Sequence, residues 1–97
     1  MNRDFQFYDS RIVDYSHVGE TLTLFCVYGI NEKWRTCFYR VKAVEGEDNL
    51  VGRTISFLGY ETPRVGYTLY FRDSPNTASV ITPEHWQRLP GWYICQG

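Results

Sequence analysis

The sequence is poor in residues that build helices. Alanine and lysine each occur twice, as Ala43, Ala78, Lys33 and Lys42, whereas aromatic residues make up 18% of the chain. Aromatic and β-branched residues favour strands, and alanine favours helices. We therefore exclude an all-helical bundle and expect an all-β fold.

The chain also lacks long apolar runs and a bias toward one charge. The longest mostly apolar run, residues 22–30, is interrupted by Thr23 and Gly29 and is well short of the roughly 20 residues that cross a bilayer. The first residues do not place an apolar stretch after a basic one, as a secretory signal would. With a net charge of −1 and no low-complexity linker, we expect one β-rich domain over residues 1–97 that is cytoplasmic and does not bind membranes.

Cysteine is scarce, and no two cysteines are close in sequence. Cys26, Cys37 and Cys95 form an odd set without a Cys-x-x-Cys pair, so the ligand spacing of a zinc site is missing. We expect three buried thiols in a reducing cytoplasm. The alternative is a bridge between Cys26 and Cys37.

Catalytic and cofactor motifs are missing as well. The eight glycines are dispersed and form no phosphate-binding loop, and there is no Gly-x-Ser-x-Gly elbow. The two histidines, His17 and His85, have no metal-ligand spacing, although folding could bring either of them to Cys37. We expect no enzyme activity, no cofactor and no metal.

Strand patterns run along most of the chain. A bulge or bend is expected near Asp9 and Ser10, where the alternation of the first strand breaks. Thr82 as N-cap, Pro83 at the first helical position and an acid after it predict a short helical turn over residues 83–88. This pattern indicates a small SH3-like or OB-like barrel, or a compact sandwich, of five to seven antiparallel strands. The expected strands are residues 5–15, 20–28, 33–44, 50–58, 67–72, 77–82 and 92–95.

The clearest local signal is a hairpin formed by residues 20–28 and 33–44. With Asn31 and Glu32 as a two-residue loop, Cys26 lies opposite Cys37, and Phe25 lies opposite Phe38. A four-residue loop would keep the same faces together. This register places an apolar face in the core, formed by Leu22, Leu24, Cys26, Cys37, Tyr39, Val41 and Ala43.

The opposite face of this hairpin mixes aromatic and basic residues, and we expect it to bind a partner. Eight arginines and a high aromatic content favour a non-enzymatic protein-binding module, such as a stoichiometric inhibitor or adaptor. The alternative is a single-stranded nucleic-acid-binding domain, which would stack bases on the rings and hold phosphates with the cations. The sequence leaves two further possibilities open. One is a second layer that covers the rings, and the other is a homodimer. The candidate residues are Phe25, Trp34, Phe38, Arg40 and Lys42.

Overall fold

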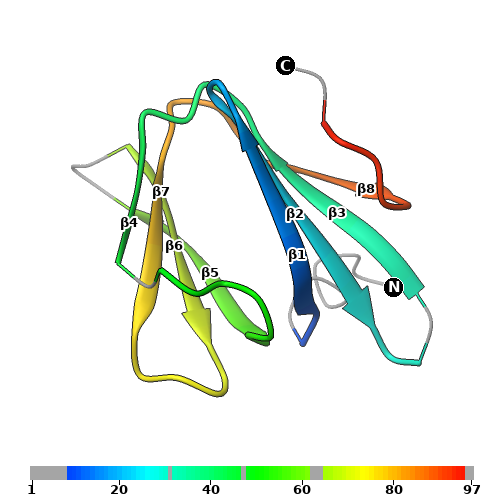
Figure 1. Ribbon diagram of the computed structural model, residues 1–97. Helices are drawn as coiled ribbons and strands as arrows, with labels where there is room; N and C mark the ends of the chain where they lie inside the picture. The colour runs from blue at the N-terminus through cyan, green and yellow to red at the C-terminus, as the bar shows by residue number, and fades with distance from the viewer. Residues whose placement is uncertain (1–8, 31, 47, 62–64, 96–97) are drawn as a thin grey trace.

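The computed structural model describes residues 9–30, 32–46, 48–61 and 65–95 and forms two layers of antiparallel strands (Figure 1). The first sheet has the order β1-β2-β3-β8, and the second has the order β4-β7-β6-β5. The strands are β1 (Arg11–Val18), β2 (Thr21–Tyr28), β3 (Glu32–Phe38), β4 (Ala43–Gly46), β5 (Ile55–Glu61), β6 (Gly66–Phe71), β7 (Thr77–Ile81) and β8 (Gln87–Pro90).

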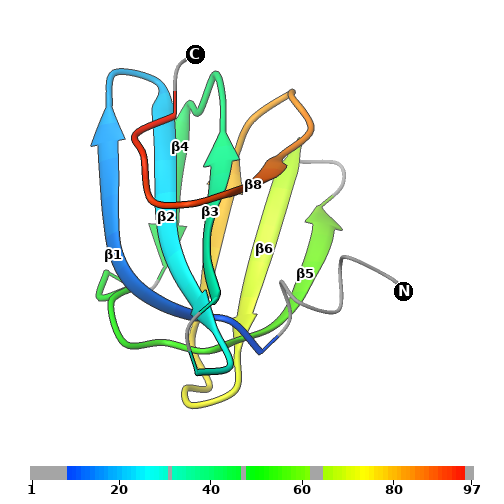
Figure 2. The same ribbon diagram turned by 90° about the vertical axis from the view of Figure 1, so that its right-hand side faces the viewer.

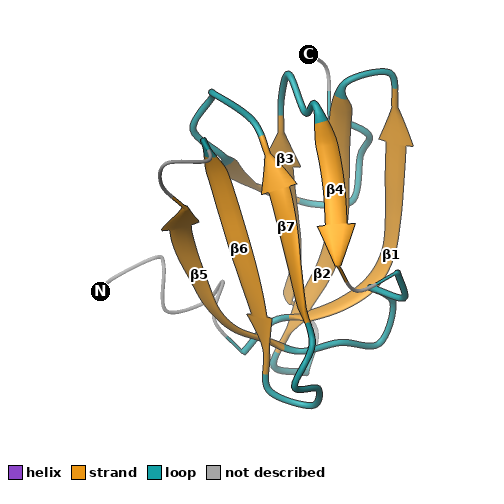
Figure 3. Cartoon of the chain, turned by 90° about the vertical axis from the view of Figure 1, so that its left-hand side faces the viewer, coloured by secondary structure: helices purple, strands orange, loops and turns teal. Residues whose placement is uncertain are grey.

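The all-β prediction is confirmed, and the architecture is the sandwich alternative. The two sheets face one another without closing into a barrel (Figures 1 and 3). An isolated bridge between Arg11 and Thr54 joins them at one corner. The described residues form eight strands, one more than the predicted upper bound of seven.

The predicted helical turn over residues 83–88 is wrong. The local capping bond does form, because the Glu84 N–H donates to Thr82 Oγ1 at 3.1 Å. The chain then extends as β8 because Leu89 and its neighbours pair with Arg35 and the rest of β3. The predicted final strand at residues 92–95 is also wrong, since these residues belong to no strand.

The hairpin of β2 and β3 exists, but its predicted register is wrong. Tyr28 pairs with Glu32 and Cys26 with Trp34, so three residues connect the strands, and Gly29 takes a φ of +65° at the turn. Glycine adopts this conformation without the strain of a side chain. The predicted partner of Cys26 was Cys37, so the register differs by three positions, and an odd shift exchanges the two faces of β3.

The prediction also carried β3 too far along the chain. The strand ends at Phe38, and Arg40 has a left-handed backbone with a φ of +53°. Charges at Arg40 and Lys42 therefore do not bear on which face of β3 is buried. Without them, the pattern argument for the predicted register fails.

The core lies between the inner faces of the sheets. Alternation in β2 buries Leu22, Leu24 and Cys26, as predicted, and alternation in β6 buries Leu69 and its apolar neighbours while Tyr70 points outward. Phe38 is fully buried among these residues, with its ring 6.1 Å from the ring of Tyr67. The buried cluster is Ile12, Leu22, Leu24, Cys26, Phe38, Val41, Leu50, Ile55, Leu58, Tyr67, Leu69, Phe71, Ala78 and Val80.

The chain turns at Asp9, which has a φ of +76°, so the bend predicted near Asp9 and Ser10 is confirmed, and a separate bulge lies within β1. The register shifts between Ile12 and Asp14, so the extra residue is Val13. Upstream of the bulge, the Asp9 N–H donates to the carbonyl of Ile55 at 2.6 Å. The chain therefore joins the second sheet before it enters the first. Residues 5–8 of the predicted first strand lie outside the described part of the chain.

Candidate functional site

The segment that follows β8, residues 91–95, crosses the outer face of the first sheet and is called the strap below. It runs over β3 and β2 on the side turned away from the second sheet (Figures 1 and 2). Trp92 Nε1 donates to the carbonyl of Cys26 at 2.9 Å, and the Cys95 N–H donates to Thr23 Oγ1 at 3.0 Å. These bonds fix the strap on the sheet at both of its ends.

A disulfide between Cys37 and Cys95 adds a covalent attachment. The two Cα atoms are 5.9 Å apart, a usual separation for a bridge. The expectation of three free thiols and the alternative bridge between Cys26 and Cys37 are both wrong. In the observed register Cys37 faces outward beneath the strap, whereas Cys26 faces the core.

Cys26 is the free cysteine, and its surroundings make it inert. Burial raises the pKa of its thiol to about 12 because the charged thiolate would lose its hydration. The nucleophilic form is therefore scarce near neutral pH. Cys26 contributes to the core and offers no reactive group to a substrate.

Two cations of β3 lie over the aromatic rings of the strap. Lys33 Nζ is 4.8 Å from the centre of a Trp92 ring, and Arg35 Cζ is 5.5 Å from the centre of the Tyr93 ring. Arg35 Nη1 also donates to the carbonyl of Pro90 at 2.6 Å. Arg35 thus holds the strap in place, while Lys33 has no carboxylate partner within the described residues.

The turn into the strap requires glycine. Gly91 has a φ of +81°, and a Cβ atom there would lie 3.0 Å from a carbon of the Tyr93 ring. A side chain at this position would therefore strain the backbone and displace the ring. Gly91 sets the path that places Tyr93 beside Arg35.

The strap leaves apolar side chains exposed. Trp92, Tyr93 and Ile94 have exposed fractions of 39%, 70% and 53%. Beside Trp92 there is an open hollow of about 410 Å³, lined by Val13, Asp14, Phe25 and Trp92. We call the combined surface the strap face, formed by Phe25, Val27, Lys33, Arg35, Trp92, Tyr93 and Ile94.

The structure does not bring the five predicted binding residues together. Phe25 lies on the outer face as expected, but Phe38 is sealed in the core. Trp34 lies on the side of the first sheet opposite to Phe25. There Arg88 Cζ is 4.5 Å from the centre of the Trp34 ring. Arg40 and Lys42 follow β3 and sit at one end of the sandwich. The expectation of one continuous face from these residues is therefore wrong.

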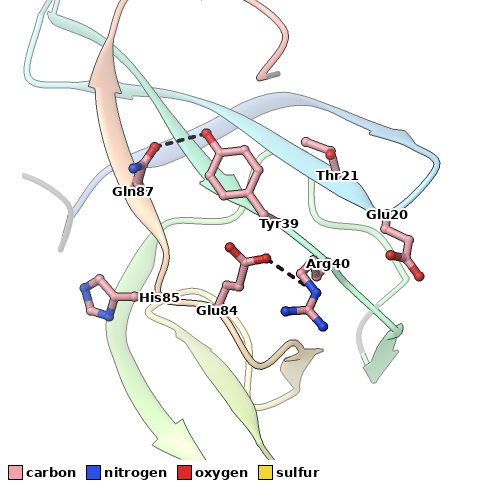
Figure 4. Close-up of a pocket in the computed structure, with 7 residues that line it drawn as sticks. All are labelled: Glu20, Thr21, Tyr39, Arg40, Glu84, His85 and Gln87. Atoms are coloured by element: carbon pink, nitrogen blue, oxygen red, sulfur yellow. Dashed lines mark hydrogen bonds and ion pairs between the residues drawn. The ribbon is translucent and has the colours of Figure 1, made fainter. Parts of the chain in front are cut away.

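An end pocket lies around Arg40, and its charges are balanced. The depression measures about 590 Å³ and is lined by seven residues (Figure 4). Arg40 pairs with Glu84 at 3.6 Å, and Lys42 pairs with Glu20 at 3.0 Å. With both cations neutralised, this pocket has no excess charge to attract an anion. Its lining is Glu20, Thr21, Tyr39, Arg40, Glu84, His85 and Gln87.

His85 at the edge of the end pocket is held by Tyr67. The Tyr67 hydroxyl and His85 Nδ1 are 3.0 Å apart, and the Trp86 N–H donates to the same hydroxyl. Burial raises the pKa of Tyr67. The direction of the hydrogen bond between this hydroxyl and Nδ1 depends on the tautomer of the imidazole. In Figure 4 its ring points away from Tyr39 and Gln87.

The described residues contain no group of three or more His, Cys, Asp or Glu side chains that could hold a metal ion. They also include no helix of the length and hydrophobicity needed to pass through a lipid bilayer. Comparisons with protein-family models, with curated proteins and with solved structures found no match.

Sequence reasoning missed most of the strap face. The predicted register, which turned Cys37 inward, implies by alternation that Lys33 and Arg35 also face the core. Trp92, Tyr93 and Ile94 were expected within a final strand. The connecting loop contained a usable signal, because a three-residue hairpin loop with a glycine in the left-handed conformation is common. That register turns Cys37 outward, where Cys95 can reach it.

Proposed function

We propose that this protein is a non-enzymatic protein-binding module and that the strap face is its contact surface. The observation that carries the proposal is the exposure of Trp92, Tyr93 and Ile94 on a segment that is fixed in place. Large aromatic side chains dominate the energetics of protein interfaces. Lys33 and Arg35 stand beside them, so the surface combines rings with cations, and Phe25 is the one predicted binding residue that belongs to it.

The way in which the strap is held supports a binding role. A segment that is already ordered loses little conformational entropy when a partner docks. The disulfide, two hydrogen bonds and two cation-ring contacts order residues 91–95 before any partner arrives. A rigid surface of this kind suits a stoichiometric inhibitor or an adaptor, which must present one shape.

Substitution of the most exposed strap residue tests this proposal. We expect Tyr93→Ser to weaken capture of the partner from source-cell extract by at least roughly tenfold, because interface aromatics contribute strongly. Tyr70→Ser is the matched control, since Tyr70 is also exposed but lies on β6 in the second sheet. Equal capture by both variants, with native circular dichroism spectra, would remove the strap face from consideration.

Binding of single-stranded nucleic acid is the second candidate, and the stacked pairs on the strap favour it. Lys33 with Trp92 and Arg35 with Tyr93 place a cation beside a ring twice in succession. Against this, a net charge of −1 gives little of the electrostatic attraction that supports such binding. An oligothymidine titration at about 50 mM salt distinguishes the candidates, because tryptophan quenching that fades steeply with added salt indicates nucleic-acid binding.

The disulfide also gives information on the cellular compartment in which the protein resides. Disulfides persist in oxidising environments and are rare in the reducing cytoplasm. A bridge between Cys37 and Cys95 therefore favours an oxidising compartment over the cytoplasmic location that the sequence suggested. Trapping thiols with a mass-tagged alkylating agent at the moment of cell lysis tests this: one tag per denatured chain indicates the bridge, and three tags indicate a reduced protein.

A further inference from the structure

The hollow beside the strap has the form of a receptor for one apolar side chain. Phe25, Val13 and Trp92 supply apolar walls, and Asp14 supplies the polar one. The Asp14 carboxylate already accepts the Tyr15 N–H at 2.8 Å. Trp92 cannot turn away from the hollow without breaking its bond to the carbonyl of Cys26. The walls are therefore fixed rather than adaptable.

Two cations flank the aromatic walls of this hollow, whereas its polar wall carries the single negative charge of Asp14. Lys33 lies over Trp92, and Arg35 lies opposite Phe25 in the strand pairing, so one cation borders each of the two aromatic residues that line the hollow. The whole chain has a net charge of −1, which makes this surface different in sign from the molecule that carries it. A surface of one sign attracts a segment of the opposite sign.

We propose that the strap face binds an acidic peptide segment that carries one large apolar side chain. The apolar side chain enters the hollow against Phe25 and Trp92, and carboxylates next to it in the peptide meet Lys33 and Arg35. This inference rests on the proposed function and specifies the chemistry of the partner. Asp14 orients the peptide, because its charge repels acidic residues from its side of the hollow.

The experiment uses synthetic peptides and the full oxidised chain. The probe is a short peptide with one phenylalanine flanked by glutamates, and its binding is measured by calorimetry and by NMR shifts of the Trp92 indole N–H. Replacing the phenylalanine with alanine should weaken binding roughly ten- to a hundredfold, because burial of the ring is lost. Replacing the glutamates with lysines should abolish binding.

Two lysine variants locate the charge contact. We expect Lys33→Gln to weaken binding of the acidic peptide roughly threefold, the usual effect of one exposed charge contact. Lys42→Gln is the matched control, because Lys42 is the other lysine of the chain and pairs with Glu20 at a distant end of the first sheet. It should bind the peptide like the wild type. Asp14→Asn should strengthen binding by a similar factor.

The following results would contradict an acidic peptide as the partner, and they show whether the proposed protein-binding function fails with it. If the acidic peptide does not bind but Tyr93→Ser still reduces partner capture, the strap face binds a protein of other chemistry. Equal binding of the basic peptide, an equal effect of both lysine variants, or binding of oligothymidine in place of the peptide also contradicts an acidic partner. Self-association of the wild type through this face, seen as a doubled mass that Tyr93→Ser restores to monomer, would identify a second copy as the occupant.

Discussion

Three aromatic residues of the hairpin illustrate how an odd shift in strand register changes the environment of each side chain. The sequence placed Phe25, Trp34 and Phe38 on one surface, and the structure gives each a different environment. Alternation in β2 was sufficient to place Phe25, because Leu22 and Leu24 are plainly apolar and define its inner face. No such contrast exists in β3, where Trp34, Cys37 and Phe38 are apolar on both faces, so periodicity could not determine its direction.

Alanine substitution distinguishes the observed register from the predicted one. We expect Phe38→Ala to lower the free energy of unfolding by about 3–5 kcal/mol, because it leaves a cavity in a fully buried site. Phe25→Ala, which removes a half-buried ring of the outer face, should cost no more than roughly 1.5 kcal/mol. Urea denaturation of both variants measures the difference. Similar losses in the two variants would contradict the burial described for Phe38.

Two buried acids predict a loss of stability at alkaline pH. Burial raises the pKa of Cys26 from 9.0 to about 12 and also raises that of Tyr67. Below their ordinary pKa values both groups are neutral in the folded and unfolded states, so stability is unaffected there. As pH rises above about 9, the unfolded chain loses these protons first, and stability falls.

Denaturation midpoints measured from pH 7 to pH 11 check this dependence. Cys26→Ala should flatten the part of the profile that begins near pH 9. A wild-type profile that is level across this range would contradict the burial of both groups. Alkylation at pH 8 offers a second readout, because the Cys26 thiol should react only after denaturation.

At the scale of elements, the strap is the feature that local sequence patterns could not reveal. Residues 92–95 are rich in strand formers, and a strand was a sound interpretation of them. Their actual position depends on contacts with distant residues, since Trp92 bonds to Cys26 and Cys95 is joined to Cys37. The predicted helical turn over residues 83–88 is wrong for a related reason, because strand pairing with β3 outweighed a weak local preference for helix. By contrast, the ends of β2, β6 and β7 were predicted to within one residue, since each is a run of strand-forming residues bounded by turn signals.

Reduction should loosen the strap and the face that it carries. The bridge closes a loop between residues 58 positions apart, and the chain-entropy model assigns such a closure roughly 4 kcal/mol. We therefore expect a reductant to lower the free energy of unfolding by up to about this amount and to weaken partner binding. The double variant Cys37→Ser/Cys95→Ser should behave like the reduced wild type and should not respond to the reductant. A wild type whose unfolding is the same with and without reductant would show that the bridge does not form.

At the scale of the whole molecule, the described residues of the open sandwich leave four sheet edges, and each carries a feature that discourages pairing with another chain. β1 has a bulge and the exposed charge of Asp14, and β8 is a four-residue strand that ends at Pro90. β4 is equally short and contains Glu45, and the register of β5 shifts between Ile55 and Phe57. Bulges, short strands, charges and proline are the usual means by which sheet edges avoid association.

From these edges we expect a monomer rather than the homodimer that the sequence left open. Light scattering should give the monomer mass of 11.4 kDa across a wide range of concentrations. Removing one protective feature provides the contrast, because Asp14→Val places an apolar residue on the bulged edge of β1 and should promote association. A wild type that doubles its mass as concentration rises would show that an edge or the strap face is self-complementary. The effect of Tyr93→Ser then separates these two routes, since it alters the strap face and leaves every edge strand intact.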